Sequence, residues 1–440
     1  MKFEMIGHEY RYAVDQTVAA LKLEGELRSK LSYGSRYVTA SADYNGYKGT
    51  ARCRAEDISD STAQKIIKTS IYRAVIASGA QRPPWGALTG VRPGKLMRPL
   101  MNAAEFSKLY DVSRERAQLC YETACFTQAA QDSLLPGDVC LYVGIPFCPT
   151  RCAYCSFVSA SVEKSMKLIE PFIDALLKEM DKTEIGGNIV SVYFGGGTPT
   201  TLNPEQLDRV LGRLEQRYDL TKLREFTVEA GRPDTITAQK LEVLKRHGVT
   251  RVSVNPQTMS DSVLEAIGRK HTAEDIRQAL KLVRQAGGIE INMDLIAGLP
   301  SDSVEGFFAS IDEVINLSPE NITVHTLSLK NGSNITVKGT DIPGAAEVAR
   351  MLDYAYGRLR ENGYKPYYLY RQKNMSGGFE NTGWTKQGNE NLYNICMMEE
   401  LCSVIALGAG GSTKIIEDGK ISRKVNPKYP LEYIERYVQA

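Results

Sequence analysis

The chain has 440 residues, of which 42% are hydrophobic and 24% charged, and its formal net charge is +2. This length suffices for two or three domains, and the near-neutral charge gives no electrostatic reason to expect nucleic acid or an anionic membrane surface as a partner. No apolar run is long enough to span a bilayer and the first residues do not resemble a signal peptide, so we expect a soluble, cytoplasmic chain.

Residues 1–132 predict an accessory α+β domain. In chain order, the sequence predicts a strand over 2–12, a helix over 14–31, a β-hairpin over 36–55 that turns at Asn45-Gly46, a helix over 61–79, and a helical pair in 103–132 whose second member can be capped by Ser113. Between them, residues 81–100 are rich in Pro and Gly and carry Arg92 and Lys95. This segment fits either a structured linker with solvated charges or a clamp for an anionic substrate.

From residue 133 to 330, apolar strands alternate with amphipathic helices. The predicted strands are 140–147, 189–197, 225–231, 251–257, 291–300 and 321–329, and the predicted helices are 163–183, 204–217, 237–247, 261–268, 272–286 and 303–317. Strands that are apolar on both faces and joined by helices form a parallel sheet. The fold class expected is therefore α/β, a partial parallel (β/α)6 barrel. A doubly wound open sheet is the alternative.

Residues 331–440 predict an irregular α/β C-terminal extension that covers the substrate. A helix is expected over 344–364, a strand over 365–373, a long Gly- and Asn-rich loop over 375–391, and a helix followed by a strand over 395–416.

Three of the nine cysteines, Cys148, Cys152 and Cys155, follow the first barrel strand with the spacing C-x3-C-x2-C. Three thiolates on one loop can hold three corners of a [4Fe–4S] cluster and leave the fourth iron open for chemistry. A zinc knuckle, which would need a fourth soft ligand, and incidental cysteines are the alternatives. The other six cysteines are interpreted as buried small hydrophobes: Cys53, Cys120, Cys125, Cys140, Cys396 and Cys402.

Unusual polar and glycine residues follow the other barrel strands. They are Gly195, Gly196, Gly197 and Thr198 after the second strand, Glu229 after the third, Gln257 after the fourth, Asp294 in the fifth and His325 in the sixth. In a parallel barrel the active site lies at the carboxyl ends of the strands, so these residues are expected to surround the cysteine loop. Ordinary roles are open for each: a tight turn for the glycines, a salt bridge for Glu229, and core packing for His325.

The segments CPTRCAYC, YFGGGTPT and DLIAGLP resemble radical S-adenosylmethionine enzymes. More narrowly, YVGIPFC, GRKHT and GALTGVRP are similar to the oxygen-independent coproporphyrinogen III dehydrogenase group, and the flanks resemble its HemZ branch. The resemblance implies that Cys148, Cys152 and Cys155 bind the cluster. It also implies that an electron passed to S-adenosylmethionine releases methionine and a 5′-deoxyadenosyl radical.

The resemblance further implies the contacts of S-adenosylmethionine. The residues concerned are Tyr142, Tyr154, Gly195, Gly196, Gly197, Thr198 and Glu229, with Gln257, Arg269 and Asp294 for a possible second molecule. The substrate implied is a tetrapyrrole such as coproporphyrinogen III, whose carboxylates Arg92, Lys95, Arg151 and Arg371 could meet. The reducing partner implied is a flavodoxin or ferredoxin.

Two departures from the dehydrogenase pattern keep the reaction open. Gly144 stands where that group carries a His, and Phe157 where it carries a further Cys. The haem motif of the related haem chaperones also has Glu380 in place of its ligating His. A radical methyltransferase acting on a tetrapyrrole and a haem-handling protein of the same family therefore remain as alternatives.

Overall fold

The computed structural model describes residues 1–90, 92–97, 100–155, 160–161, 165–328, 342–372 and 376–438. The chain forms two compact units, the first made of Met1–Tyr121 with Arg371–Asn374, and the second of Glu122–Tyr370 with Met375–Ala440. The division into functional segments at residues 132 and 330 stays a prediction.

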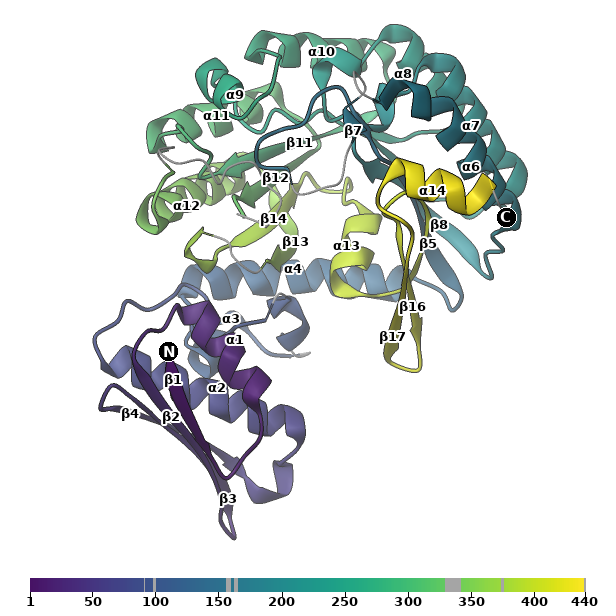
Figure 1. Ribbon diagram of the computed structural model, residues 1–440. Coiled ribbons are helices and arrows are strands. Elements are labelled where there is room, and N and C mark those ends of the chain that lie inside the picture. Colours follow the sequence, from purple (N-terminus) through teal and green to yellow (C-terminus); the bar gives the residue numbers. More distant parts are fainter. Residues whose placement is uncertain are drawn as a thin grey trace. The chain divides into compact units, whose positions relative to one another are not determined.

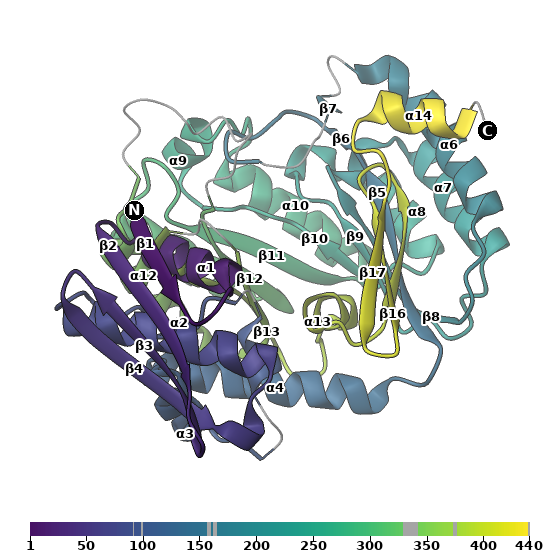
Figure 2. The same ribbon diagram turned by 60° about the horizontal axis from the view of Figure 1, so that its bottom comes forward.

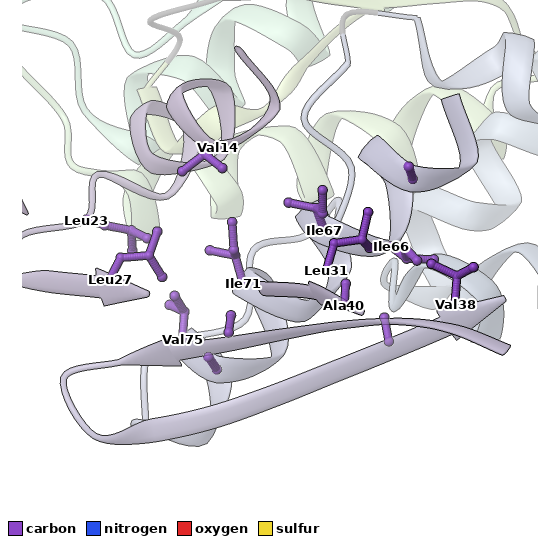
Figure 3. Packing of buried hydrophobic residues seen from close by; sticks show 14 residues of the cluster. Val14, Leu23, Leu27, Leu31, Val38, Ala40, Ile66, Ile67, Ile71 and Val75 are labelled. Atoms are coloured by element: carbon purple, nitrogen blue, oxygen red, sulfur yellow. The ribbon is translucent and has the colours of Figure 1, made fainter. Parts of the chain in front are cut away.

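The first unit is a small sheet covered by helices. Its strands lie in the order β1 (Lys2–Ile6), β2 (Glu26–Tyr33), β3 (Tyr37–Tyr44) and β4 (Tyr47–Arg54), with β1 parallel to β2 and the other pairs antiparallel. Helices α1 (Arg11–Leu21) and α2 (Asp60–Ala77) bury Val14, Ile67 and Ile71 against Leu27 and Leu31 of β2 (Figure 3). The unit is completed by α3 (Ala103–Tyr110) and by the start of α4 (Arg114–Ser133).

The predicted helix over 14–31 is wrong in its second half. Helix α1 ends at Leu21, where Lys22 adopts a left-handed conformation, and residues 26–33 form strand β2 instead. In β2 exposed and buried residues alternate, which is the period of a strand with one buried face. The predicted hairpin is confirmed, because Asn45 and Gly46 both have positive φ (50° and 89°) between β3 and β4.

Helix α4 begins where the sequence predicts. The Ser113 hydroxyl accepts a hydrogen bond from the Arg116 amide at 3.2 Å, which satisfies one of the free amides of the first turn.

The second unit is organised around one curved sheet. Within the described residues this sheet has 11 strands in the order β13-β14-β12-β11-β10-β9-β8-β5-β15-β16-β17 (Figures 1 and 2). The strands are β5 (Asp138–Ile145), β8 (Asn188–Gly196), β9 (Glu225–Glu229), β10 (Arg251–Ser253), β11 (Glu290–Ala297), β12 (Asn321–Thr326), β13 (Lys365–Arg371), β14 (Glu380–Thr385), β15 (Ser403–Gly408), β16 (Ser412–Glu417) and β17 (Lys420–Val425). A short pair, β6 (Phe147–Cys148) and β7 (Ala160–Ser161), lies apart from it.

The predicted (β/α)6 arrangement is confirmed by strand pairing. The strands β5, β8, β9, β10, β11 and β12 are neighbours in this order and are all parallel. Figure 1 shows the connecting helices along the outer side of this sheet. The helices of the unit are α6 (Ile169–Lys182), α7 (Pro204–Arg217), α8 (Ala238–Arg246), α9 (Asp261–Ala266), α10 (Ala273–Ala286), α11 (Val304–Leu317), α12 (Ala345–Glu361), α13 (Leu392–Glu399) and α14 (Pro430–Val438).

The C-terminal extension adds strands to both edges of the parallel sheet. Strand β15 pairs with β5 in parallel register, with Gly408 opposite Gly144. At the other edge β14 pairs antiparallel with β12, with Trp384 opposite Ile322. No helix of the described residues is both long and apolar enough to cross a membrane.

The predicted loop over 375–391 is wrong for residues 380–385, which form β14. All six of its residues are buried, including Glu380 and Trp384. Gly383 is the position that allows this packing, since a Cβ there would lie 1.9 Å from the ring of Tyr368. Strand β14 is therefore part of the core, although its composition is polar.

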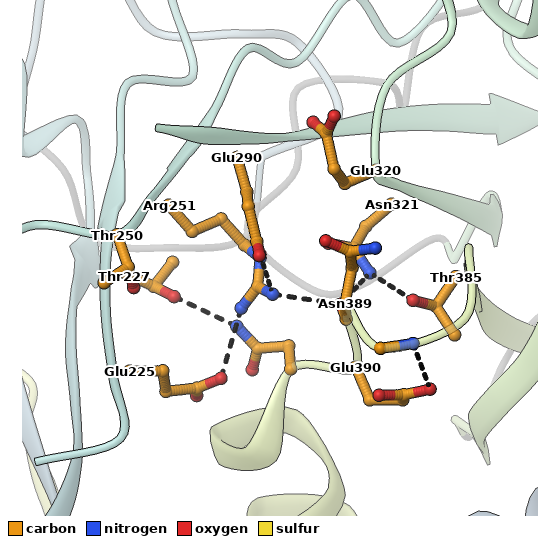
Figure 4. A network of polar contacts seen from close by, with 12 residues as sticks. Glu225, Thr227, Thr250, Arg251, Glu290, Glu320, Asn321, Thr385, Asn389 and Glu390 are labelled. Carbon is orange, nitrogen blue, oxygen red and sulfur yellow. Dashed lines mark hydrogen bonds and ion pairs between the residues drawn. The ribbon is translucent and has the colours of Figure 1, made fainter. Parts of the chain in front are cut away.

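A polar network joins the amino ends of four parallel strands (Figure 4). Glu225, Arg251, Glu290 and Asn321 are the first residues of β9, β10, β11 and β12. The buried Arg251 guanidinium bonds to Glu225 at 3.1 Å, to Glu290, and to the Asn389 carbonyl at 2.9 Å. The Asn321 amide donates to the same carbonyl at 2.8 Å. The network therefore ties the segment before α13 to the base of the sheet.

We predict that Arg251→Met lowers the free energy of unfolding of the second unit by about 3–5 kcal/mol, because it leaves the buried Glu225 carboxylate without its cation. The matched control is Arg209→Met, whose ion pairs with Glu170 and Asp174 are 43–60% exposed and which should cost at most about 1 kcal/mol. Denaturant unfolding followed by circular dichroism compares the two. If both variants lose the same free energy of unfolding, the buried pair stabilises the sheet no more than the exposed ion pairs do.

Candidate functional site

The cysteine loop begins at the carboxyl end of the first barrel strand. Cys148 is the last residue of β6, which continues the chain from β5, and Cys152 and Cys155 follow on a loop. The three thiols are partly exposed and none is in a disulfide. The Ala153 amide donates to the Ile267 carbonyl at 3.0 Å, which holds the loop against the turn that precedes Arg269.

The spacing of these thiols fits a multi-iron cluster better than a single ion. Among the described residues, Cys148, Cys152 and Cys155 do not form a group whose sulfur atoms all lie within 4.8 Å of one another. Ligands of one zinc ion lie within that separation, whereas the thiolates of an iron–sulfur cube each bind a different iron and stand farther apart.

Two arginines give the loop the positive surroundings that thiolate ligands need. Arg232 donates from Nη1 to the Cys152 sulfur at 3.1 Å and also bonds to Thr150. Burial raises the pKa of the Cys152 thiol, but the charges of Arg269 and Arg232 outweigh burial, and the net effect is a lowered pKa. Arg232 was not among the residues predicted from the sequence. Its position three residues after Glu229, at the same strand end, is the signal that could have found it.

Arg269 lies beside the cluster loop but its guanidinium is already bonded. It donates to the Tyr154 hydroxyl at 3.0 Å, to the Asn255 carbonyl at 2.7 Å and to the Gly231 carbonyl at 3.2 Å. Tyr154 is thereby fixed between Cys152 and Cys155, and burial raises the pKa of its hydroxyl group. In this arrangement Arg269 positions the loop, while its buried Nε has no hydrogen-bond partner among the described residues and could still donate to a carboxylate ligand.

The glycine run after β8 packs directly on the start of the cysteine loop. The amides of Gly197 and Thr198 donate to the carbonyls of Ile145 and Phe147, both at 2.7 Å. A Cβ on Gly197 would lie 2.5 Å from the Phe147 carbonyl oxygen, so glycine is required for this approach. The Thr198 hydroxyl lies 3.6 Å from the Cys148 sulfur. Both amides therefore already donate hydrogen bonds within the protein. The carbonyl oxygens of the glycine run are the groups that could accept hydrogen bonds from an ammonium group.

Glu229 ends β9 in a buried position beside the glycine run. The Tyr193 hydroxyl donates to its carboxylate at 2.7 Å. A Cβ on Gly195 would stand 3.1 Å from that carboxylate, which explains the absence of a side chain at this position. Burial raises the pKa of Glu229 to about 7, because it outweighs the opposing hydrogen bond from Tyr193.

Three stacked tyrosine rings lie under the Glu229 carboxylate. The Tyr193 and Tyr393 rings are 4.5 Å apart, and Tyr142 stacks on each of them at 6.3 Å. Tyr142 was predicted from the sequence, but Tyr193 and Tyr393 were not. Tyr393 comes from α13 in the C-terminal extension, and no local pattern links it to the barrel.

Gln257 follows the end of β10 and meets Asp294, the fifth residue of β11. Gln257 has a positive φ of 71°, and its amide donates to the Asp294 carbonyl at 2.8 Å. The Asp294 carboxylate accepts a hydrogen bond from Asn292 at 2.8 Å and lies 3.7 Å from the His325 ring. Burial raises the pKa of Asp294, but the His325 contact and other hydrogen bonds outweigh it, so this pKa is lowered. His325 thus faces Asp294 rather than the surrounding helices.

The sequence also indicated three further positions, Gly144, Arg371 and Phe157. Gly144 lies against the C-terminal extension, since a Cβ there would lie 2.6 Å from the Ala409 carbonyl oxygen. Arg371 donates to the Leu88 carbonyl at 2.7 Å and covers the Trp85 ring, so it supports the residue 88–93 segment. Phe157 lies outside the described residues.

Both the core and the flanks of the chain are similar to known proteins. Residues 142–314 match the model of the radical SAM superfamily. Over 434 residues the chain is 38% identical to the oxygen-independent coproporphyrinogen-III oxidase-like protein HemZ of Bacillus subtilis, covering 92% of this chain and 87% of that protein. It is 25% identical to the heme chaperone HemW of Escherichia coli, over 68% of this chain and 77% of that one. The structure of coproporphyrinogen III oxidase (HemN) from Escherichia coli superposes with a TM-score of 0.58 at 23% identity, covering 71% of this chain and 72% of that one.

We predict a pH dependence of stability that belongs to Glu229. Folding raises its pKa to about 7 from the usual value of 4.5. The raised pKa therefore contributes stability that is fully present below about pH 4.5 and is lost as pH rises through 7. Relative to Glu229→Gln, the ligand-free wild-type protein should lose on the order of 3 kcal/mol of unfolding free energy across that range. Urea unfolding at several pH values measures the difference, and parallel profiles would contradict it.

Proposed function

Because the chain belongs to the radical SAM superfamily, and within it to the coproporphyrinogen-III oxidase-like proteins of the HemZ type, we propose that it performs an oxygen-independent oxidative decarboxylation of a tetrapyrrole propionate. Coproporphyrinogen III is the substrate we propose, with protoporphyrinogen IX as the product. The observation that carries the proposal is the gathering of Glu229, Asp294 and the cysteine loop at the carboxyl ends of one parallel sheet.

The cofactors of this family are a [4Fe–4S] cluster and S-adenosylmethionine, which together supply a 5′-deoxyadenosyl radical. Cys148, Cys152 and Cys155 would hold the cluster. Arg232 and Arg269 would stabilise its thiolates, since their charges already lower the pKa of Cys152. Tyr154, held by Arg269 at 3.0 Å, would exclude water from the side of the loop that it covers.

Glu229 would bind the ammonium group of S-adenosylmethionine through the carboxylate that Tyr193 holds at 2.7 Å. A cation beside this buried group would stabilise its ionised form, which burial now disfavours. Tyr142 and the carbonyls of Gly195 and Gly196 would complete the binding surface.

We propose one molecule of S-adenosylmethionine as the working cofactor. A second molecule at Gln257, Arg269 and Asp294 would have the Arg269 Nε as its donor, since both terminal nitrogens already bond to protein oxygens and Nε has no partner among the described residues.

In the proposed reaction the bound cofactors would supply the abstraction of one hydrogen atom from a propionate side chain. Loss of carbon dioxide and of one electron to an external acceptor then leaves a vinyl group. A flavodoxin or ferredoxin would provide the electron that starts each turnover.

Haem handling is the competing function, because heme chaperones are among the similar proteins. In that group the haem ligand lies in a motif that corresponds here to residues 380–384. Here Glu380 is fully buried in β14 and accepts a hydrogen bond from the Tyr356 hydroxyl at 3.0 Å. This placement favours the enzyme, since the segment is part of the core.

We predict that Cys152→Ala abolishes the brown chromophore of the anaerobically reconstituted protein and its cleavage of S-adenosylmethionine. The variant should keep the wild-type circular dichroism spectrum, because the loop thiols are partly exposed and outside the core. Cys125→Ala, which removes an exposed thiol on α4, is the matched control and should retain both properties. Unfolding of Cys152→Ala alone would indicate a structural metal instead.

We also predict that coproporphyrinogen III increases the release of 5′-deoxyadenosine by the reduced protein at least tenfold. Mass spectrometry should show a product that has lost two carboxyl groups. A methylated tetrapyrrole would assign the chain to methyl transfer. Tight haem binding without substrate-dependent turnover would assign it to haem handling, and either result would overturn the proposal.

A further inference from the structure

A second group of cysteines, separate from the cluster loop, meets inside the second unit. Cys140 lies in β5, Cys396 in α13, and Cys402 directly before β15. Their sulfur atoms all lie within 4.8 Å of one another, and those of Cys140 and Cys402 are 3.6 Å apart. We refer to these three residues as the buried trio. From the sequence these three residues were interpreted as buried small hydrophobes.

The separations in the buried trio match a single metal ion. With metal–sulfur bonds of about 2.3 Å, two thiolates on one tetrahedral ion lie about 3.8 Å apart. The thiolates of an iron–sulfur cube bind different irons and are separated by about 6 Å. The buried trio is therefore too compact for a cube and has the dimensions of a mononuclear site.

The surroundings are those of a closed, soft-ligand site. Cys140 and Cys396 are fully buried and Cys402 is 8% exposed. They pack with apolar neighbours, among them Val404 and Ile395, and none of the three is in a disulfide. Simple core packing would not require three thiols from segments as much as 262 residues apart to converge.

We propose that Cys140, Cys396 and Cys402 bind one divalent thiophilic cation of the zinc type. Soft thiolate ligands select such ions over hard cations. A divalent ion leaves three thiolates with a single net negative charge, and a monovalent ion would leave two, which costs more in an apolar interior. Binding releases the thiol protons to solvent. The fourth ligand would be a water molecule on the side of Cys402, the member with residual exposure.

The ion would connect β5 with two segments that lie far from it in the sequence. Cys140 is the third residue of β5, five residues before the strand ends and eight before Cys148. The bound ion would fasten α13, which carries Tyr393 of the tyrosine stack, to β5 and to the start of β15. Its role is therefore to hold the C-terminal extension on the barrel.

The test uses the full-length chain with Cys148→Ala, Cys152→Ala and Cys155→Ala, so that the cluster loop cannot bind the added metal. After exposure to Zn2+ under reducing conditions and dialysis, this background should retain one zinc per chain by elemental analysis. Adding Cys396→Ala should reduce retention at least tenfold. Adding Cys120→Ala, which removes another buried cysteine, is the matched control and should leave retention unchanged.

A spectroscopic measurement keeps the test independent of the folding of Cys396→Ala. X-ray absorption of the zinc-loaded background variant should show three sulfur ligands at about 2.3 Å. Retention of less than a tenth of an ion, a coordination sphere without sulfur, or retention that Cys396→Ala leaves unchanged would overturn the proposal. A Cys140–Cys402 disulfide without bound metal, or binding of Cu+ but not Zn2+, would also overturn it.

Discussion

The Glu225 carboxylate is the contact on which both the interior of the barrel and its C-terminal extension depend. It accepts hydrogen bonds from the Ser191 hydroxyl at 2.8 Å and from Arg251 at 3.1 Å, which joins β8, β9 and β10. It also accepts from the amides of Leu392 and Tyr393, at 2.8 and 2.7 Å, at the start of α13. A carboxylate at a helix amino terminus is favourable, and here it adds to the cap of α13, where the Asn391 side chain accepts a hydrogen bond from the Asn394 amide.

This placement has two consequences further along α13. Tyr393 joins the ring stack beneath Glu229, and Cys396 joins Cys140 and Cys402. Glu225 lies at the amino ends of the strands. Because it holds the start of α13, it also fixes the position of Tyr393 in the ring stack beside Glu229. The residues that line the proposed cofactor site cannot be understood from the barrel alone.

Residues whose role follows from local pattern were predictable. The strand-and-helix alternation between residues 133 and 330 identified all six parallel strands. The strand-end rule then placed Glu229, Gln257 and Asp294 on the correct elements. Residues 26–33 were mistaken for helix because Leu27 and Leu31 also fit a helical spacing, while the burial alternates with period two. Residues 380–385 were mistaken for loop because their polar side chains are satisfied by distant partners, such as Tyr356 for Glu380.

Contacts between distant segments were beyond the reach of sequence patterns. Tyr393 has ordinary neighbours in the chain, and only the tertiary fold brings it to the Tyr142 and Tyr193 rings. The same holds for the pairing of β15 with β5, since those strands lie more than 250 residues apart, as the Cys140–Cys402 contact shows. For Arg269 the residue was named from the sequence, but its hydrogen-bond partners were not. They are three protein oxygens that no motif could have indicated.

The absence of a histidine at position 144 has a structural explanation in the same extension. Gly144 is opposite Gly408 in the β5–β15 pair, and a Cβ on Gly408 would lie 2.2 Å from the Gly144 carbonyl oxygen. A Cβ on Gly144 would in turn lie 2.6 Å from the Ala409 carbonyl oxygen. Any side chain at 144 is therefore incompatible with the close approach of the strands. Polar side chains stand instead on other strands of the sheet, as His325 does at 3.7 Å from Asp294.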